Sequence, residues 1–489
     1  MSKTAAIIGG GVIGGGWAAR FLLNGWDVQV FDPDPQAERK IGEVIANARR
    51  ALPGLTDVAL PPEGKLSYHA TIAEAVQGAQ WVQESVPEQL KIKQATLADI
   101  QSACDAEAVI GSSTSGFKPS ELQQGATRPE QIMVAHPFNP VYLLPLVELV
   151  APEAAPELID KAKAVLTSLG MYPLHLKKEI DAHVADRLLE AVWREALWLV
   201  KDGIATTEEI DDSIRYGFGI RWAQMGLFET YRVAGGEAGM KHFMAQFGPA
   251  LKWPWTKLMD VPEFTDELVD LIAGQSDAQS GMHGIRDLER IRDNNLVVMM
   301  RGLKAQNWGA GALLNAQEHE MRKGTVHGAL AADLPADALV ETAHRTVPLD
   351  WTDYNGHMTE SRYLHAFADA TDRFMEIIGC NAEYISKGGS YFTAETHIRH
   401  VDEVHAGVVI TIRTRVIMGE GKKMHLWHEM YDGDRLLATG EHFLLHVSLE
   451  TRKPSPAAPH IEAALVRFAK GHAGLPTPEG LGRAIGAPR

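Results

Sequence analysis

The sequence predicts a chain of three parts: an α/β domain with a doubly wound parallel sheet, an all-α domain and an α+β module. Short apolar strands alternate with helical segments over residues 1–181, which is typical of a parallel sheet. Helical periodicity continues, without convincing strands, over 182–325. After a linker at 326–338, period-two alternation surrounds one strong helix over 339–473. The remaining residues, 474–489, are rich in Pro and Gly, and we expect a flexible tail there.

The first part begins with a strand, a glycine-rich turn and a helix. Ala5–Ile8 is short and apolar, and the following helix is expected over Val12–Leu23, ended by Asn24 and a glycine. Val28–Phe31 is expected to form the second strand. Further strands are expected at residues 81–83, 109–110 and 132–134.

The two later parts differ in their hydrophobic period. In the second part, apolar residues recur at helical spacing, at positions 188, 192, 196 and 199. In the third part, residues 408–418 alternate apolar and polar side chains, and strands are also expected at 424–431 and 436–447. A helix over about Thr359–Ile378 has one apolar face, formed by Tyr363, Phe367, Ala370, Phe374 and Ile377.

Composition excludes several classes of protein. The 489 residues contain 47 Lys and Arg against 63 Asp and Glu, and a net charge of −16 argues against general affinity for nucleic acid or anionic membranes. Two cysteines, Cys104 and Cys380, cannot form a disulfide framework and fit a reducing compartment. The 20 histidines lack metal-ligand spacing, so no metal site is expected. We see no membrane-spanning run and no signal-peptide pattern, and therefore expect a cytoplasmic enzyme.

The glycine-rich turn predicts a dinucleotide site. Gly9, Gly11 and Gly14 form the pattern Gly-x-Gly-x-x-Gly between a strand and a helix. The first glycine permits a tight turn, the second lets the backbone approach a pyrophosphate, and the third lets the helix pack closely on the strand. Val12 and Ile13 lie at the start of that helix, where free N–H groups favour a phosphate.

Asp32 decides which dinucleotide is expected. It ends the second strand, where its carboxylate can accept hydrogen bonds from both ribose hydroxyls and would repel a 2′-phosphate. NAD is therefore expected rather than NADP. A merely structural turn is the alternative, but strand, helix and Asp32 all fall where the cofactor requires them.

Polar residues further along suit the oxidation of an alcohol. An imidazole titrates near neutral pH and can accept the hydroxyl proton while hydride leaves to nicotinamide. A carboxylate on its other nitrogen fixes the tautomer. His136 and Glu148 are candidates for this pair, Ser115 can hold the substrate oxygen, and Asn139 is expected on the substrate side. A buried structural histidine and a helix-capping serine are the alternative.

With these motifs, residues 4–320 resemble the 3-hydroxyacyl-CoA dehydrogenase family, which combines a Rossmann domain with a helical C-terminal domain. The spacing of 21 residues from Ser115 to His136, then 12 to Glu148, matches the family's serine, histidine base and paired glutamate. The resemblance implies the same roles here. It also places two charged residues on the cofactor side, Glu88 and Lys93.

One position departs from the family pattern. The family usually opens its helical domain with an Asn-Arg pair, but here the pair is Asp186 and Arg187. An ionised aspartate cannot donate a hydrogen bond to a substrate oxygen. A carboxylate near the site would instead suit a cationic substrate, although pairing with Arg187 is an equally plausible alternative.

The helical part is also rich in large aromatic residues, whose faces attract quaternary ammonium groups. Taken singly, each is better explained as part of the core. The segment 215–226, which includes Phe218 and Trp222, is similar to the L-carnitine dehydrogenase branch of the family. The resemblance implies L-carnitine, a 3-hydroxy acid with a trimethylammonium group, as the substrate. Asp186, Phe218 and Trp222 are then expected to bind it.

The last part contains the segment 347–358 directly before its strong helix. This segment resembles the entry to the long helix of hotdog-fold, 4-hydroxybenzoyl-CoA thioesterase-like enzymes, in which a curved antiparallel sheet wraps one helix. The resemblance implies Asp353 as nucleophile or as base for water, with helix N–H groups polarising the thioester carbonyl. A plain turn at Asp353 is the alternative. Hotdog domains generally dimerise, so a homodimer is expected. The weaker candidates are Asp350, Asn355 and His357.

Over nearly its whole length the sequence resembles bacterial fusions of such a dehydrogenase with a betainyl-CoA thioesterase. The resemblance implies NAD-dependent oxidation of L-carnitine to 3-dehydrocarnitine, and hydrolysis of betainyl-CoA to glycine betaine and CoA. The alternative is a dehydrogenase for a 3-hydroxyacyl-CoA or a hydroxy sugar acid. In that case the hotdog module would serve only for dimerisation or acyl-CoA binding.

Overall fold

The computed structural model describes residues 3–152, 154, 156–234, 243–246, 256, 263, 265–322 and 328–484. Part of the predicted linker and the end of the predicted tail lie outside these residues. The chain forms two compact units. One contains residues 1–49 and 61–315, and the other contains 50–60 and 316–489.

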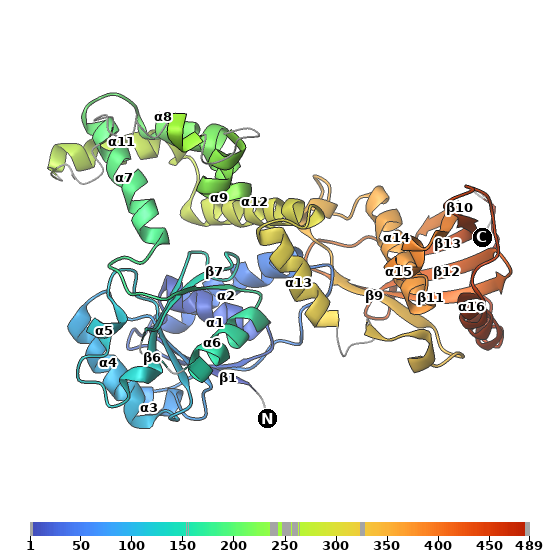
Figure 1. Ribbon diagram of the computed structural model, residues 1–489, viewed down its shortest axis with the longest axis horizontal. Helices are drawn as coiled ribbons and strands as arrows, with labels where there is room; N and C mark the ends of the chain where they lie inside the picture. Colours follow the sequence, from blue (N-terminus) through green and yellow to red (C-terminus); the bar gives the residue numbers. More distant parts are fainter. Residues whose placement is uncertain are drawn as a thin grey trace. The chain divides into compact units, whose positions relative to one another are not determined.

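The first unit is built on an eight-stranded sheet, which confirms the predicted doubly wound α/β fold (Figure 1). The strand order is β3-β2-β1-β4-β5-β6-β7-β8, and neighbours are parallel except for the antiparallel pair β6 and β7. The order reverses between β1 and β4, which creates a crevice at their carboxyl ends. The strands are β1 (Thr4–Ile8), β2 (Asp27–Phe31), β3 (Leu66–Tyr68), β4 (Trp81–Glu84), β5 (Val109–Ser112), β6 (Ile132–Pro137), β7 (Leu146–Val150) and β8 (Tyr172–Leu176).

Helices cover this sheet and bury its apolar side chains. Trp17 and Phe21 of the first helix are fully buried, and the Trp17 ring centroid lies 6.2 Å from that of Trp81 in β4. This packing fixes the start of the helix beside the carboxyl end of β1. The helices are α1 (Val12–Leu23), α2 (Ala37–Ala51), α3 (Ile72–Ala75), α4 (Leu90–Ala103), α5 (Pro119–Leu122) and α6 (Pro156–Ser168).

In the remainder of the first unit, all the regular elements that the structure describes after β8 are helices, as the periodicity predicts. A π-helical turn, η3 (Ile214–Phe218), joins two of the helices. The α-helices are α7 (Ala185–Lys201), α8 (Thr207–Ser213), α9 (Gly219–Ala234), α11 (Asp266–Ser280), α12 (Ile285–Ala305) and α13 (Ala310–Arg322), and the last of these crosses into the second unit.

The second unit is an antiparallel sheet that packs against one long helix, which confirms the α+β hotdog prediction. The strand order is β10-β13-β12-β11-β9. The apolar face of the long helix is buried, and Phe367 and Phe374 on it are fully inaccessible. The strands are β9 (Val340–Thr346), β10 (Gly389–His400), β11 (Val409–Glu420), β12 (Lys423–Asp432) and β13 (Arg435–Ser448); the helices are α14 (Glu360–Ile377), α15 (Ala382–Ser386) and α16 (Pro459–His472).

The start of the predicted tail makes defined contacts. The Arg415 guanidinium donates hydrogen bonds to the carbonyls of His472, Leu475 and Pro476. Arg399 donates to the carbonyl of Glu479 at 3.0 Å. None of the described helices is long and apolar enough to cross a membrane.

Candidate functional site

The glycine-rich turn lies at the point where the strand order reverses. Gly9 has a φ of +96°, and a Cβ there would collide with the backbone of Ser85 after β4. A Cβ at Gly14 would overlap the Gly9 carbonyl oxygen, so α1 can begin this close to β1 only with glycine. At Gly11 a Cβ would meet nothing within 4 Å, which leaves the backbone open to a ligand.

Three of the other predicted cofactor residues lie beside this opening. Val12 is exposed and Ile13 is half-buried in the first turn of α1. Asp32 follows β2, and its Oδ2 accepts a hydrogen bond from the Gly10 amide at 2.5 Å. The Asp34 amide donates to its Oδ1 at 2.7 Å. The carboxylate is therefore held at the edge of the glycine turn.

Glu88 and Lys93 form a charged network at the carboxyl ends of β4 and β5. The buried Lys93 ammonium lies 2.9 Å from Glu84 Oε1 and 3.2 Å from Glu88 Oε2. Glu88 Oε1 accepts hydrogen bonds from the Thr114 hydroxyl at 2.5 Å and the Gly116 amide at 3.1 Å. The network thus holds the loop that contains Ser115. The sequence does not single out Glu84 and Thr114, because a glutamate and a threonine without a distinctive motif do not indicate a role in such a network.

His136 and Glu148 face each other across the antiparallel pair β6 and β7. His136 Nδ1 lies 3.1 Å from Glu148 Oε2, and Glu148 Oε1 accepts the amides of Val184 and Ala185, each at 2.9 Å. Burial alone would raise the pKa of Glu148, but the hydrogen bonds from His136 and from the two amides outweigh it and lower that pKa. An ionised Glu148 fixes the proton of neutral His136 on Nδ1 and leaves Nε2 as the acceptor.

Asp186 lies on the other side of the same imidazole. Its Oδ2 is 3.6 Å from His136 Nε2, so the structure brings it to His136. Burial raises the pKa of Asp186, an effect that the coulombic attraction of His136 opposes. His183, which sequence reasoning passed over, has its ring centroid 5.6 Å from that of His136. Burial lowers the pKa of His183 and favours its neutral form.

Ser115 and Asn139 occupy loops near this pair. Ser115 follows Thr114, whose carbonyl lies 3.3 Å from His183 Nε2. Ser115 is half-buried, and Asn139 is exposed in the connection between β6 and β7. The structure gives neither side chain a hydrogen bond to His136, so their predicted roles toward the substrate stay predictions.

Phe218 and Trp222 are neighbours in the helical part. Their ring centroids are 4.6 Å apart with the planes inclined by 56°. Both rings are half-buried, at the junction of η3 with α9. Two adjacent aromatic faces of this kind can bind a quaternary ammonium group.

Asp353 lies in an exposed turn before α14. Its Oδ1 accepts the amides of Asn355 at 2.8 Å and of His357 at 3.2 Å, so the residue does form the turn that the sequence offered as the alternative. These bonds also orient the carboxylate. The Thr359 side chain makes no capping bond at the start of α14.

A cavity of 720 Å³ lies beside the start of α14. Glu360, Ser361 and Leu364 of that helix line it, together with residues 396–400 of β10 and Arg483. Asp353 does not line this cavity. The volume is sufficient for a drug-sized ligand.

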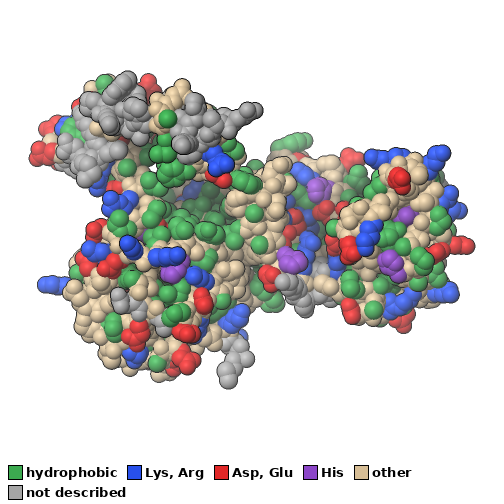
Figure 2. Space-filling view, viewed as in Figure 1, with side chains coloured by type: hydrophobic (Ala, Val, Ile, Leu, Met, Phe, Trp, Pro, Cys, Tyr) green, Lys and Arg blue, Asp and Glu red, His purple; other side chains and the backbone are tan. Residues whose placement is uncertain are grey.

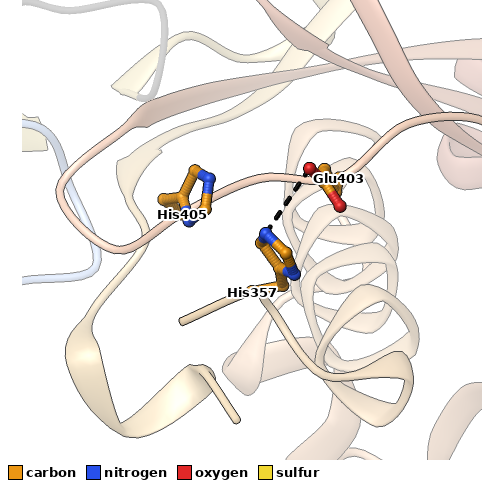
Figure 3. Close-up of side chains that lie close together, drawn as sticks. All are labelled: His357, Glu403 and His405. Atoms are coloured by element: carbon orange, nitrogen blue, oxygen red, sulfur yellow. Dashed lines mark ion pairs between the residues drawn. The ribbon is translucent and has the colours of Figure 1, made fainter. Parts of the chain in front are cut away.

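One group of side chains in the described part of the chain could hold a metal ion: His357, Glu403 and His405, with ligand atoms within 4.8 Å of one another. His357 Nε2 points toward Glu403 Oε1 at 3.4 Å (Figure 3). His405 Nδ1 lies 3.0 Å from the Gly356 carbonyl. Two imidazoles and a carboxylate suit a zinc-type ion. The sequence predicts no metal site, because His357 lies far along the chain from Glu403 and His405 and the three form no known metal-binding motif.

Comparison with known proteins assigns each part of the chain to a family. Residues 4–180 match the NAD binding domain and residues 183–266 the C-terminal domain of 3-hydroxyacyl-CoA dehydrogenase. Residues 347–465 match the thioesterase-like superfamily. The fold and its glycine turn thus define an NAD-dependent dehydrogenase joined to a thioesterase-like module.

Relatives of known name extend this assignment to the whole chain. An L-carnitine dehydrogenase/betainyl-CoA thioesterase of Ruegeria pomeroyi is 73% identical over 486 residues, covering 99% of each chain. An L-carnitine dehydrogenase of Mesorhizobium japonicum is 60% identical and covers 68% of this chain and 91% of its own length. This chain belongs to the L-carnitine dehydrogenase/betainyl-CoA thioesterase family.

A solved structure shares the fold of the first unit. It is a 5-formyl-3-hydroxy-2-methylpyridine 4-carboxylic acid 5-dehydrogenase, described as an NAD+-dependent dismutase. It is 26% identical, covers 62% of this chain and 99% of its own, and superimposes with a TM-score of 0.52.

Proposed function

We propose that this protein oxidises the 3-hydroxyl of L-carnitine to 3-dehydrocarnitine with NAD, and that its second unit hydrolyses betainyl-CoA to glycine betaine and CoA. The observation that supports the first reaction most directly is the buried pair of His136 and Glu148, 3.1 Å apart, with Asp186 on the far side of the imidazole. A relative 73% identical over 99% of both chains bears the names of both activities.

The residues at the glycine turn fit NAD. Gly11 leaves space for a pyrophosphate, the first turn of α1 supplies N–H groups to it, and Asp32 stands beyond β2 for the ribose hydroxyls. Bound there, NAD would supply an acceptor for the hydride that leaves the substrate carbon. The buried Lys93 ammonium pairs with Glu84 and with the partly exposed Glu88, and this network holds the adjoining loop.

His136 is the proposed base. With its proton on Nδ1 held by Glu148, Nε2 accepts the proton of the 3-hydroxyl as the hydride departs. The carboxylates of Glu148 and Asp186 then stabilise the imidazolium that forms. Ser115 donates a hydrogen bond to the substrate oxygen in this mechanism.

Asp186 is proposed to select a cationic substrate. An amide would supply a donor at this position, whereas a carboxylate supplies charge that attracts the trimethylammonium group. A cation beside Asp186 also favours its ionised form, against the burial that raises its pKa. Phe218 and Trp222 offer aromatic faces for the same group, with centroids 4.6 Å apart.

Replacement of Asp186 by Asn should raise the KM for L-carnitine about tenfold, because about 1.4 kcal/mol of cation binding is lost. NADH formation measured over a range of L-carnitine concentrations checks this. The matched substrate is the neutral isostere in which carbon replaces the quaternary nitrogen, whose KM should not rise. An unchanged KM for L-carnitine in the variant would remove Asp186 from the cation site.

Asp353 is the proposed catalytic carboxylate of the second unit. Oδ1 is held by two backbone amides, which leaves Oδ2 to attack the thioester carbonyl or to take a proton from water. The uncapped start of α14 follows and offers N–H groups to the carbonyl oxygen. The adjoining cavity of 720 Å³ offers space for part of the acyl-CoA.

The decisive experiment offers the purified protein NAD with L-carnitine, D-carnitine or 3-hydroxybutyryl-CoA and follows NADH absorbance. Turnover with L-carnitine alone supports the proposal. Turnover only with the CoA substrate would replace it by a 3-hydroxyacyl-CoA dehydrogenase carrying a thioesterase. Release of CoA from betainyl-CoA, followed with a thiol reagent, tests the second reaction in the same preparation.

We also propose that the protein works as a cytoplasmic homodimer. β10 is an end strand of its five-stranded sheet, and its free edge can pair with the same strand of a second copy. Large hydrophobic side chains are also exposed on α9, at Ile220 and Phe228, and on α12, at Val298 and Met299. Figure 2 shows hydrophobic side chains, in green, gathered on the surface of the molecule. Sedimentation at micromolar concentration should give the mass of two chains; a single-chain mass would contradict the proposal.

A further inference from the structure

A short segment from early in the sequence belongs to the same compact unit as the last third of the chain. Residues 50–60 lie in this unit, although the sequence predicts them within the dinucleotide-binding domain. The Ala59 amide donates to the His344 carbonyl in β9 at 2.9 Å. The Asp57 amide donates to Glu318 Oε1 in α13 at 2.5 Å. Backbone and side-chain bonds thus tie the segment to two elements of the second unit.

The Asp57 side chain reaches a buried cation. Arg345, in β9, is only 2% exposed. Its Nη2 donates to Asp57 Oδ1 at 2.5 Å and its Nη1 to Asp369 Oδ2 of α14 at 3.0 Å. A buried guanidinium is strongly destabilising unless carboxylates pair with it, and here two segments far apart in the sequence supply them.

The same guanidinium supports Trp351. Its central carbon lies 3.9 Å from the centroid of the Trp351 ring, which is 1% exposed. The Trp351 carbonyl accepts the amide of Thr359 at 2.9 Å, so the loop from 352 to 358 begins and ends against this tryptophan. That loop contains Asp353. The tryptophan, which packs on Arg345, thus holds both ends of the loop, and the Met358 amide adds a bond to the Val404 carbonyl at 2.8 Å.

We propose that Asp57 is a positioning residue for the thioesterase reaction. By pairing with Arg345 it fixes the guanidinium on Trp351, and through that ring it fixes the loop that presents Asp353. Asp57 touches neither the substrate nor Asp353 in this account. The inference rests on the proposed hydrolysis at Asp353 and adds that the second activity requires a residue from the first 60 of the chain.

The test uses the full-length Asp57→Asn variant, which removes the charge and keeps the size of the side chain. The kcat for betainyl-CoA hydrolysis should fall about tenfold with an unchanged KM, since a displaced catalytic group costs rate rather than binding. L-Carnitine oxidation should not change. In an Arg345→Gln background, Asp57→Asn should not lower the kcat for hydrolysis any further, because both substitutions remove the same contact between Asp57 and Arg345. Glu63→Gln, which breaks the exposed pair with Arg49, is the matched control.

Each outcome bears on the proposal. Unchanged hydrolysis in Asp57→Asn overturns the proposal, and so does a change in KM with an unchanged kcat. The proposal is also overturned if Asp57→Asn lowers the kcat in the Arg345→Gln background as much as it does in the unmodified protein. If both activities fall together in Asp57→Asn, the charge-keeping Asp57→Glu decides: recovered hydrolysis supports the proposal and unrecovered hydrolysis overturns it. If the unmodified protein releases no CoA from betainyl-CoA, the proposed thioesterase activity itself fails, and the positioning role fails with it.

Discussion

His136→Gln should lower the kcat for L-carnitine oxidation about 10³-fold, the effect expected when a general base is removed. Glutamine fills much of the same volume and can still donate a hydrogen bond to Glu148, so the buried carboxylate keeps a partner. The Kd for NAD should not change, because the glycine turn and Asp32 belong to other elements. Stopped-flow NADH absorbance measures the first quantity and calorimetric titration with NAD the second.

The control for this variant is His175→Gln, which changes a half-buried histidine of β8 in the same sheet. It should retain full activity. Near-normal oxidation by His136→Gln would show that another group takes the proton. Loss of NAD binding together with activity would show instead that the variant disturbs the sheet.

Asp353→Asn should lower betainyl-CoA hydrolysis by about 10²–10³-fold, the range for loss of a catalytic acid or base. The asparagine carbonyl can still accept the amides of Asn355 and His357, so the turn persists while the carboxylate is lost. L-Carnitine oxidation and the oligomeric state should remain as they are. CoA release and NADH formation, measured on one sample, check both expectations.

Glu383→Gln provides the comparison, since it removes an exposed carboxylate that pairs with Lys387 elsewhere in the same unit. Its hydrolysis should equal that of the unmodified protein. Retained hydrolysis in Asp353→Asn would leave the turn as the only role of Asp353 and would direct attention to His357 and Glu403.

Local patterns predict most of the fold. The helix expected over Val12–Leu23 has those bounds, and the strand expected at 424–431 extends by one residue at each end. Such elements can be predicted because their apolar residues recur regularly and because residues typical of turns mark where they end. β10 was not predicted, because its sequence mixes polar and aromatic residues and five successive residues of it are exposed. An edge strand has only one bonded neighbour, so its sequence is less constrained by burial.

The candidate site was predictable to a different degree. Spacing within a known family indicated the pair of His136 and Glu148, which the register of β6 and β7 places face to face. The approach of Asp186 to His136 was not predictable, since the sequence offered Arg187 as an equally good partner. It depends on how α7 begins after Ala182 and His183, both of which have positive φ. Single-residue backbone conformations of this kind leave no periodic signal.

The discontinuity of the second unit has a consequence for how the chain can be divided. Residues 50–60 and residues 316–489 form one compact unit. A break in the backbone between these two stretches would therefore leave both of them in the same unit. A protein nicked by protease at 323–327 would keep its C-terminal fragment attached through Ala59, Asp57 and their partners. Expression of the C-terminal portion alone would produce a module lacking a piece of its own structure, with Arg345 short of one carboxylate. The chain therefore passes between the two units at both ends of residues 50–60 as well as at residue 315.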